Sequence, residues 1–426
     1  MHDIFIHSAD KGRRRMPLSA PPGSLVKGTP VTIHGLQARA DLNGCVGTLV
    51  TALDDGRHGV RVSEGAAKGT SLRIKPSNLT PKQEQQGLRL SENVVETLQH
   101  ANVPQLAWVL TEFGQSSCEF AELALLYACV LFSPEQVGNP VTWSRDGTQN
   151  VADFLRAAGH LGVLRAMDAH LHNATVQERG IQQMMTLVTS EQNALGSTDA
   201  VNAAGGAAAC VRAMQLHPTH EGVQTFGCRL LMNLCSSEAR GEETGLPTGA
   251  KRAVLAAGGI EAALKAVAAF PTHDDLISPA FKGCAYVVMS YQEAADAAIA
   301  ADGPRIAVKL IDDLQVKDEA IGHACMLLAN LCFGSTADQA SLASNALAIV
   351  GAGAIPAICK AMATRAQAEA VADAGCVALH NLAGGGHAAA CREAGAAALV
   401  EAVRRQHPQL HMRVGMLAEA LAVGVD

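Results

Sequence analysis

The feature that most constrains this chain is a small-residue element that returns along most of its length. A turn segment that usually bears Gly recurs at positions 159, 205, 258, 302, 353 and 395, in steps of 46, 53, 44, 51 and 42 residues. A second small residue follows at Gly180, Gly227, Gly283, Ala324, Gly375 and Gly415, at offsets of 21, 22, 25, 22, 22 and 20 residues. A nearly constant offset within a period of about 40 to 50 residues is typical of a helical solenoid.

The residues between these elements predict helices. In 321–332 the apolar or small residues fall at i, i+3, i+4, i+7, i+10 and i+11, which places them on one helical face. Alanine makes up roughly 18% of the chain, and aromatic residues only 3%. Such a chain packs by bringing backbones close together, which suits helices and argues against an all-β or a disordered protein.

Two sets of residues then resemble the armadillo repeat. Residues 256–260 and 351–356 match its turn into the second helix, and residues 227–235, 324–332 and 375–383 match its third helix. The resemblance covers about 150–426, and we expect about six repeats over 151–426, with a linker and degenerate capping helices over 81–150. It implies a mainly α protein built as an armadillo-type right-handed helical solenoid.

The armadillo resemblance also implies a binding site. Members of the family bind extended peptides in a concave groove lined by third helices, where Asn side chains hold the peptide backbone. The matching positions are Asn233, Asn330 and Asn381, and Arg229, Met326 and Val377 stand four residues before them, where importin-like members carry Trp. Thr186, Met289 and Leu421 interrupt the row, so recognition of basic nuclear-import signals through Trp slots is not expected. The alternative, that each Asn bonds a neighbouring helix or loop, stays open.

The first 80 residues follow a different pattern. Residues 1–25 predict a flexible arm with a basic cluster at 11–15, which is either a nuclear signal or a solvated charge run. Short alternating runs at 31–33, 47–50 and 59–62, and a closing run at 72–79, predict strands, and Asn43-Gly44 and Asp55-Gly56 predict tight turns. We therefore expect a small all-β barrel over 26–80.

The order of these turn and strand residues resembles Src-homology-3-like barrels of the KOW and Tudor-like kind, which bind peptides, nucleic acid or nothing known. Residues 1–90 carry 13 Lys and Arg against 7 Asp and Glu, and the remainder carries 20 against 33. The basic barrel therefore raises an alternative function, a nucleic-acid- or chromatin-associated factor. Residues 26–80 contain no Phe, Trp or Tyr, which removes the usual stacking platform for bases.

Other chemistries find little support in the sequence. The 12 Cys include no Cys-x-x-Cys pair, and most lie in helical stretches, so we expect reduced, core-packed thiols and a cytoplasmic protein, with the nucleus left open by the basic cluster. Pairs of His stand at 170 and 172, 217 and 220, and 407 and 411. The first two pairs recur at the same loop position, as does His273, and further ligands are lacking, so we expect no metal. No apolar run is long enough to span a membrane.

No phosphate-binding loop, nucleophile elbow or paired-carboxylate motif is present, so we expect neither an enzyme nor a cofactor. The sequence therefore predicts a non-enzymatic scaffold or adaptor whose solenoid binds an extended peptide or protein partner. Its oligomeric state is not predicted.

Overall fold

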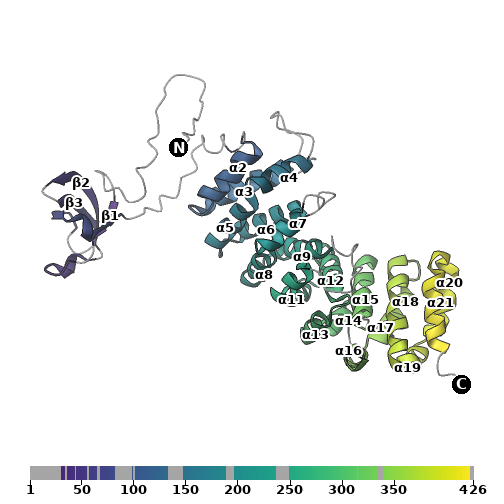
Figure 1. Ribbon diagram of the computed structural model, residues 1–426. Helices are drawn as coiled ribbons and strands as arrows, with labels where there is room; N and C mark the ends of the chain where they lie inside the picture. The colour runs from purple at the N-terminus through teal and green to yellow at the C-terminus, as the bar shows by residue number, and fades with distance from the viewer. Residues whose placement is uncertain are drawn as a thin grey trace. The chain divides into compact units, whose positions relative to one another are not determined.

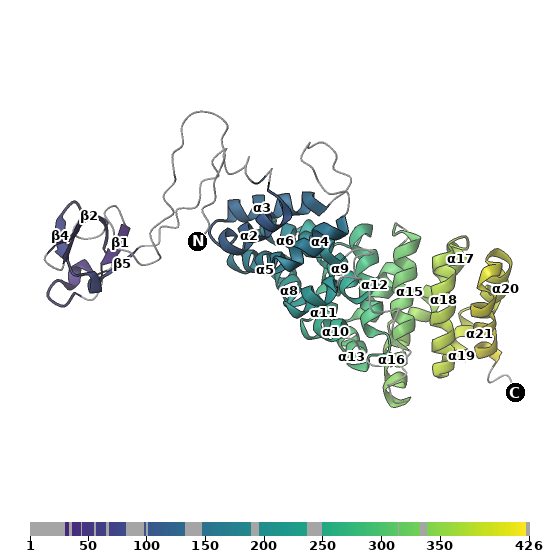
Figure 2. The ribbon, with the colours of Figure 1, turned by 45° about the horizontal axis from the view of Figure 1, so that its top comes forward.

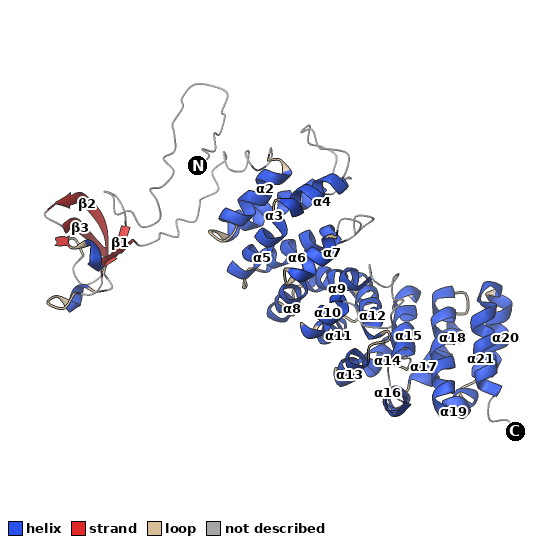
Figure 3. Cartoon of the chain, in the orientation of Figure 1, coloured by secondary structure: helices blue, strands red, loops and turns tan. Residues whose placement is uncertain are grey.

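The chain folds into two compact units, Met1–Thr97 and Leu98–Asp426. The computed structural model describes residues 30–33, 36–43, 45–54, 57–64, 68–81, 98, 101–132, 147–188, 196–236, 249–313, 315–332 and 339–422. Strands lie in the first unit, here called the sheet unit, and helices fill the second, the solenoid unit (Figures 1 and 3). The protein is mainly helical, as predicted. The predicted arm, residues 1–25, falls outside the described residues.

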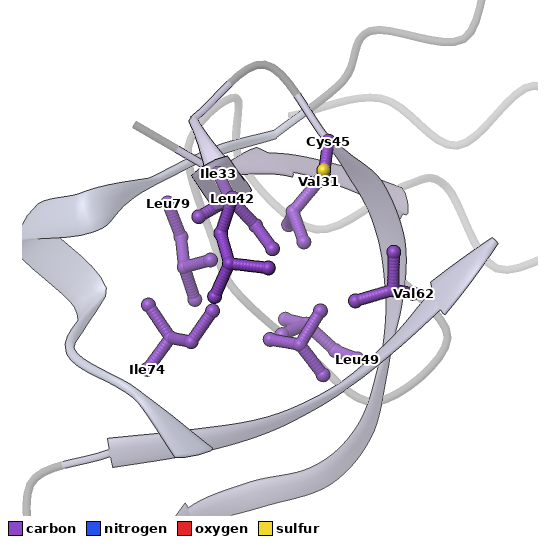
Figure 4. Packing of buried hydrophobic residues seen from close by; sticks show 9 residues of the cluster. Val31, Ile33, Leu42, Cys45, Leu49, Val62, Ile74 and Leu79 are labelled. Atoms are coloured by element: carbon purple, nitrogen blue, oxygen red, sulfur yellow. The ribbon is translucent and has the colours of Figure 1, made fainter. Parts of the chain in front are cut away.

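The sheet unit contains one antiparallel sheet. Its strands are β1 (Pro30–Ile33), β2 (Val46–Asp54), β3 (Arg57–Glu64), β4 (Ser71–Ile74) and β5 (Leu79–Pro81), in the order β4-β3-β2-β1-β5. Alternate residues turn inward and form an apolar core (Figure 4) of Val31, Ile33, Leu42, Cys45, Leu49, Val60, Val62, Ile74 and Leu79. Among the described strands no ladder joins β4 to β5, so the predicted closure into a barrel is not seen in the strand pairing.

Two turns of the sheet unit follow from single residues. Asn43 closes the β1–β2 connection, because its Oδ1 accepts a hydrogen bond from the Leu36 N–H (2.9 Å) and its Nδ2 donates to the Leu36 carbonyl (3.0 Å). The run at 72–79, predicted as one strand, is instead split into β4 and β5 by a short helical turn at Pro76–Asn78. Pro76 has no N–H to donate to a ladder and a fixed φ, which ends the strand there.

The solenoid unit consists of three-helix repeats preceded by the helices α2 (Val103–Phe113) and α3 (Cys118–Phe132). Six repeats run from Gly147 to Ala422. Their helices are α4 (Gly147–Arg156), α5 (Gly159–Ala169) and α6 (Ala174–Val188); α7 (Ser197–Ala203), α8 (Gly206–Leu216) and α9 (Glu221–Ser236); α10 (Gly249–Ala256), α11 (Gly259–Ala269) and α12 (Asp274–Val288); α13 (Gln292–Ala300), α14 (Gly303–Ile311) and α15 (Asp318–Leu331); α16 (Gln339–Gly351), α17 (Ala354–Thr364) and α18 (Glu369–Leu382); and α19 (Ala388–Glu393), α20 (Ala396–Gln406) and α21 (His411–Ala422).

Each first helix ends in one residue of left-handed backbone, after which the second helix begins. Gly occupies this place in four repeats, at Gly205, Gly258, Gly353 and Gly395, with φ between 78° and 88°. Glycine suits it because a Cβ is strained in this conformation. The turn predicted at Gly159 falls one residue earlier, at Ala158 (φ 57°), and in the fourth repeat the residue is Asp302 (φ 60°). Gly159 instead begins α5, where a Cβ would lie 2.5 Å from the ring of Phe154.

In the first, second and fifth repeats the second small-residue element brings the third helix onto the second helix of the same repeat. A Cβ at Gly180, Gly227 or Gly375 would lie 2.5–2.6 Å from the sulfur of a Met on the second helix of the same repeat. The third helices α6, α9, α12, α15 and α18 then pack one beside the next along the unit (Figure 2). Among the described residues no single helix has both the length and the apolar composition to cross a bilayer; only α16 and α17 taken together, across a 62° bend, reach that length.

Candidate binding face of the third helices

The six residues predicted to form a binding groove lie on three third helices. Arg229 and Asn233 lie on α9, Met326 and Asn330 on α15, and Val377 and Asn381 on α18, and all six side chains are half-buried. Residues four apart on a helix share a face, one turn above the other. Because α12 packs between α9 and α15, and α15 packs on α18, these pairs belong to one continuous surface, here called the third-helix face.

The amides of this face also join successive repeats. Asn330 donates from Nδ2 to the carbonyl of Ala285 on α12 (2.9 Å), and Asn381 donates from Nδ2 to the carbonyl of Ala329 on α15 (2.8 Å). An amide has a second N–H and a carbonyl oxygen beyond the one bond described here. Each of these two Asn is therefore a bridge between third helices and keeps hydrogen-bonding capacity beyond that bridge.

Arg229 is held in place by the helix of the next repeat. Its Nε donates to the carbonyl of Asp275 (3.3 Å), and its Nη2 lies 3.7 Å from the Asp275 carboxylate. Pro279, four residues further along α12, has no N–H, so the Asp275 carbonyl lacks its helical donor. The guanidinium supplies a donor in its place. The sequence singled out Arg229 but not Pro279, whose effect depends on a residue 50 positions earlier.

A recess of about 190 Å³ opens beside this arginine, at the first turns of α12 and α15. Charged groups of both signs line it, and Lys317 pairs with Asp274 across it at 3.3 Å. Ser278 on α12 lines the recess too, and its hydroxyl lies 2.9 Å from Nδ1 of His323 on α15. Burial, reinforced by the nearby Lys282 ammonium and opposed by Glu319, lowers the pKa of His323 below its ordinary value, so its ring is neutral at pH 7.

The middle of the face contains residues that the sequence did not single out. On α12 the half-buried Ser278, Lys282 and Tyr286 follow one another at intervals of four residues and lie between the α9 and α15 pairs. Their spacing of four residues is visible in the sequence and marks one helical face. The prediction of the groove left α12 out because Met289 stands where the repeat would place Asn. Lys251 on α10 is a second omission: it is fully buried, and its Nζ donates to the Met289 carbonyl (3.1 Å) at the end of α12.

The recurrent histidines serve the joints between repeats. Where the second helix ends, a ring nitrogen of His170, His217 and His407 lies 2.8–3.0 Å from a backbone carbonyl in the loop of the preceding repeat or, for His170, of the preceding helix pair. Arg365 donates to the Asp313 carbonyl (3.1 Å) at the equivalent place. These are the loop positions whose recurrence the sequence showed. In the part of the chain that the structure describes, no group of three or more His, Cys, Asp or Glu is arranged to hold a metal ion.

Comparisons with known proteins concern the fold. No protein-family model and no curated protein matches the chain. Among solved structures, an engineered protein solved by crystallography is similar at 18% identity and a TM-score of 0.52, over 77% of this chain and 82% of that one. A designed armadillo repeat protein in complex with the peptide (KR)4 is similar at 17% identity and a TM-score of 0.49, over 66% of this chain and 100% of that one. The first similarity supports the helical solenoid; it says nothing of what the chain binds.

Proposed function

We propose that this protein is a non-enzymatic interaction scaffold whose solenoid, of the armadillo type, binds an extended peptide or protein segment along the third-helix face. The observation that carries the proposal is the continuity of that face: adjacent third helices present half-buried Arg229, Tyr286, Met326 and Val377 in one surface. Half-buried side chains of mixed chemistry on rigid helices suit recognition, because they gain burial when covered and lose little freedom.

The polar groups of the face suit a main-chain ligand. An extended segment presents N–H and C=O groups along its length, and the remaining amide groups of Asn330 and Asn381 offer both a donor and an acceptor. The apolar Met326 and Val377 lie one helical turn before these amides and would cover the side chains of the same segment. On α9, Asn233 likewise stands one helical turn after a half-buried side chain, here that of Arg229.

A catalytic role is not part of this proposal. Four of the five charged groups at the recess are used in structural pairs, Arg229 with Asp275 and Lys317 with Asp274, and both pairs hold α12 to a neighbouring helix or loop. A neutral His323 beside the Ser278 hydroxyl completes a link between α12 and α15. We also propose that the sheet unit is an Src-homology-3-like barrel, supported by the order β4-β3-β2-β1-β5 and by the helical turn between β4 and β5.

A peptide selection tests the function. Random peptides of about twelve residues, displayed on phage, are selected on the immobilised full chain, and the enriched peptides are synthesised and titrated. The variant M326A/V377A should weaken their binding by about tenfold or more, which is about 1.4 kcal/mol or more. The matched control is L216A/L347A, which truncates exposed apolar side chains on α8 and α16, away from the third helices; it should change affinity by less than about twofold. Peptides that bind both variants equally, or a selection that enriches none, would contradict the proposal.

A further inference from the structure

The hydrogen bonds between third helices fix the register of α12 on the third-helix face. Asn330 on α15 donates to the carbonyl of Ala285, which directly precedes Tyr286 on α12. Asn381 on α18 bonds in the same way to the residue directly before Asn330. The amide position therefore falls at Tyr286 on α12, three residues before the position that the sequence spacing indicates. Lys282, one helical turn before Tyr286, stands where α15 and α18 carry an apolar side chain.

Charged side chains are distributed unevenly along the third helices. Asp and Glu lie in the first halves of α6, α9, α12, α15 and α18, and the second halves contain none. These second halves are residues 181–188, 229–236, 281–288, 325–331 and 376–382. The Lys and Arg that they contain are Arg229 and Lys282, on the neighbouring helices α9 and α12. This part of the face is therefore positive over α9 and α12, and it has no Lys, Arg, Asp or Glu over α15 and α18.

Lys282 is the cation of these two that is available to a ligand. Arg229 already pairs with the Asp275 carboxylate at 3.7 Å. Lys282 forms no ion pair with any residue that the structure describes, and its side chain is half-buried. Burial, and after it the Lys282 ammonium, lowers the pKa of the His323 ring on α15, so the ammonium lies near that neutral ring. A half-buried ammonium without a counter-ion gains more from a carboxylate than a fully solvated one does.

We propose that the third-helix face binds extended segments in which an Asp or Glu lies two or three residues from a large apolar side chain, with the carboxylate on Lys282 and the apolar side chain on Met326. The inference rests on the proposed function and specifies the chemistry of its ligand. The spacing follows from geometry, because packed helices lie about 8–10 Å apart and an extended chain advances about 3.3 Å per residue. Val377 on α18 continues the apolar part of the row. The Tyr286 hydroxyl, one turn after Lys282 on α12, offers the carboxylate a second donor.

The acidic balance of the solenoid unit does not exclude this ligand. Residues 91–426 carry 20 Lys and Arg against 33 Asp and Glu. On α12, however, Asp275 stands seven residues before Lys282, which is about 10 Å along a helix. Glu319 stands equally far before Met326 on α15. The Debye length at physiological salt is about 8 Å, so salt screens these carboxylates at the level of Lys282. A basic segment would instead bring a second cation to Lys282, and like charges repel.

The test compares selections of random peptides of about twelve residues, displayed on phage, on the full chain and on its variants. Peptides enriched on the unchanged chain should carry Asp or Glu two or three residues from a large apolar residue more often than the starting library does. K282E should abolish or reverse this preference, and K282R should retain it because the charge is kept. The matched control is K309E, which makes the same change at an exposed position on α14, a second helix. It should select the same acidic peptides as the unchanged chain.

A titration then measures the contact itself. One enriched peptide is compared with a version in which the carboxylate is replaced by the amide, Asp by Asn or Glu by Gln. This replacement should weaken binding to the unchanged chain by about 5- to 10-fold, and binding to K282M by less than about twofold. The effect on the unchanged chain should shrink when the salt concentration is raised from about 0.05 to about 0.5 M.

The outcomes separate this inference from the function on which it rests. Equal effects of the amide replacement on the unchanged chain and on K282M would overturn the inference. Enriched peptides that M326A/V377A weakens but that carry no excess of Asp or Glu would also overturn it, and would leave the proposed function standing. A selection that enriches no peptide would contradict both.

Discussion

Replacing the two bridging amides by alanine separates their structural role from a role in binding. In N330A the carbonyl of Ala285 loses the amide donor but still accepts the N–H of Met289 at 3.2 Å. Only one neutral hydrogen bond is lost, so we expect a cost of about 0.5–1 kcal/mol in the stability of the α12–α15 contact.

N381A should cost more. The carbonyl of Ala329 lies in the last turn of α15. The residues described after it supply no backbone donor to this carbonyl, since the N–H of Cys332 donates to the Asn330 carbonyl, and Ala329 itself is buried, with 1% exposed. Removing the Asn381 donor leaves this oxygen without the bond that the structure gives it, which costs about 1–2 kcal/mol. The loss of stability should therefore be larger for N381A than for N330A, because the two acceptor carbonyls differ in their other donors while the two Asn side chains donate in the same way.

Hydrogen exchange followed by mass spectrometry measures both joints in the full chain. A loss of about 1–2 kcal/mol speeds exchange of the amides in α15 and α18 by about 5- to 30-fold. The control is L347A, at an exposed position on α16, which should leave this exchange unchanged. Unchanged exchange in N381A would refute the reasoning on helix-end carbonyls. Faster exchange with unchanged affinity for a selected peptide would show that these amides bridge repeats and do not hold the ligand.

Three further predictions concern other parts of the molecule. A158G should stabilise the chain by about 0.5–1 kcal/mol by relieving a left-handed alanine, and G258A should destabilise it by a similar amount, as urea denaturation would show; equal signs for the two would contradict the strain argument. Burial raises the pKa of Cys284 and Cys325 to about 12, above the ordinary 9.0. The stability that these two thiols contribute is therefore complete below pH 9 and is lost as pH rises toward 12, by about 1.4 kcal/mol per thiol and pH unit. Denaturation at pH 8 to 11 would measure this loss. Residues 91–426 alone should keep the affinity of the full chain for a selected peptide; binding by the sheet unit instead would place the site there.

The repeat architecture was predictable because its determinants are local. A left-handed turn favours Gly, and a close helix contact requires a small residue, so both leave a mark in the sequence at a fixed offset. The shift from Gly159 to Ala158 shows the limit of this reasoning. Two neighbouring positions, the turn and the first residue of the second helix, both favour small residues, and the sequence cannot tell which of them adopts positive φ when only one is glycine.

The candidate site was predictable only in part. The positions of Arg229, Asn330 and Asn381 on third helices followed from the repeat, but their bonds did not. Each of these side chains reaches a backbone carbonyl 45 to 52 residues away, and a carbonyl belongs to every residue, so no residue type marks the acceptor. The prediction of one strand over 72–79 was wrong for a different reason. It gave more weight to the apolar alternation of these residues than to Pro76, which cannot donate a hydrogen bond to a ladder.

The same bonds bear on how the solenoid could bind a partner. Side chains at the ends of four second helices, those of His170, His217, Arg365 and His407, reach a carbonyl of the preceding repeat or helix pair along one side. Asn330 and Asn381 join neighbouring third helices along a second side of the solenoid unit. The joint between the fourth and fifth repeats has both kinds of bond, from Arg365 to the Asp313 carbonyl and from Asn381 to the Ala329 carbonyl. Repeats held at two separate places cannot pivot about a single contact, so the spacing between α15 and α18 is fixed before a ligand arrives. Rigid placement reduces the entropy lost on binding, so the bridging role of these amides strengthens the third-helix face as a binding surface even if they never touch the ligand.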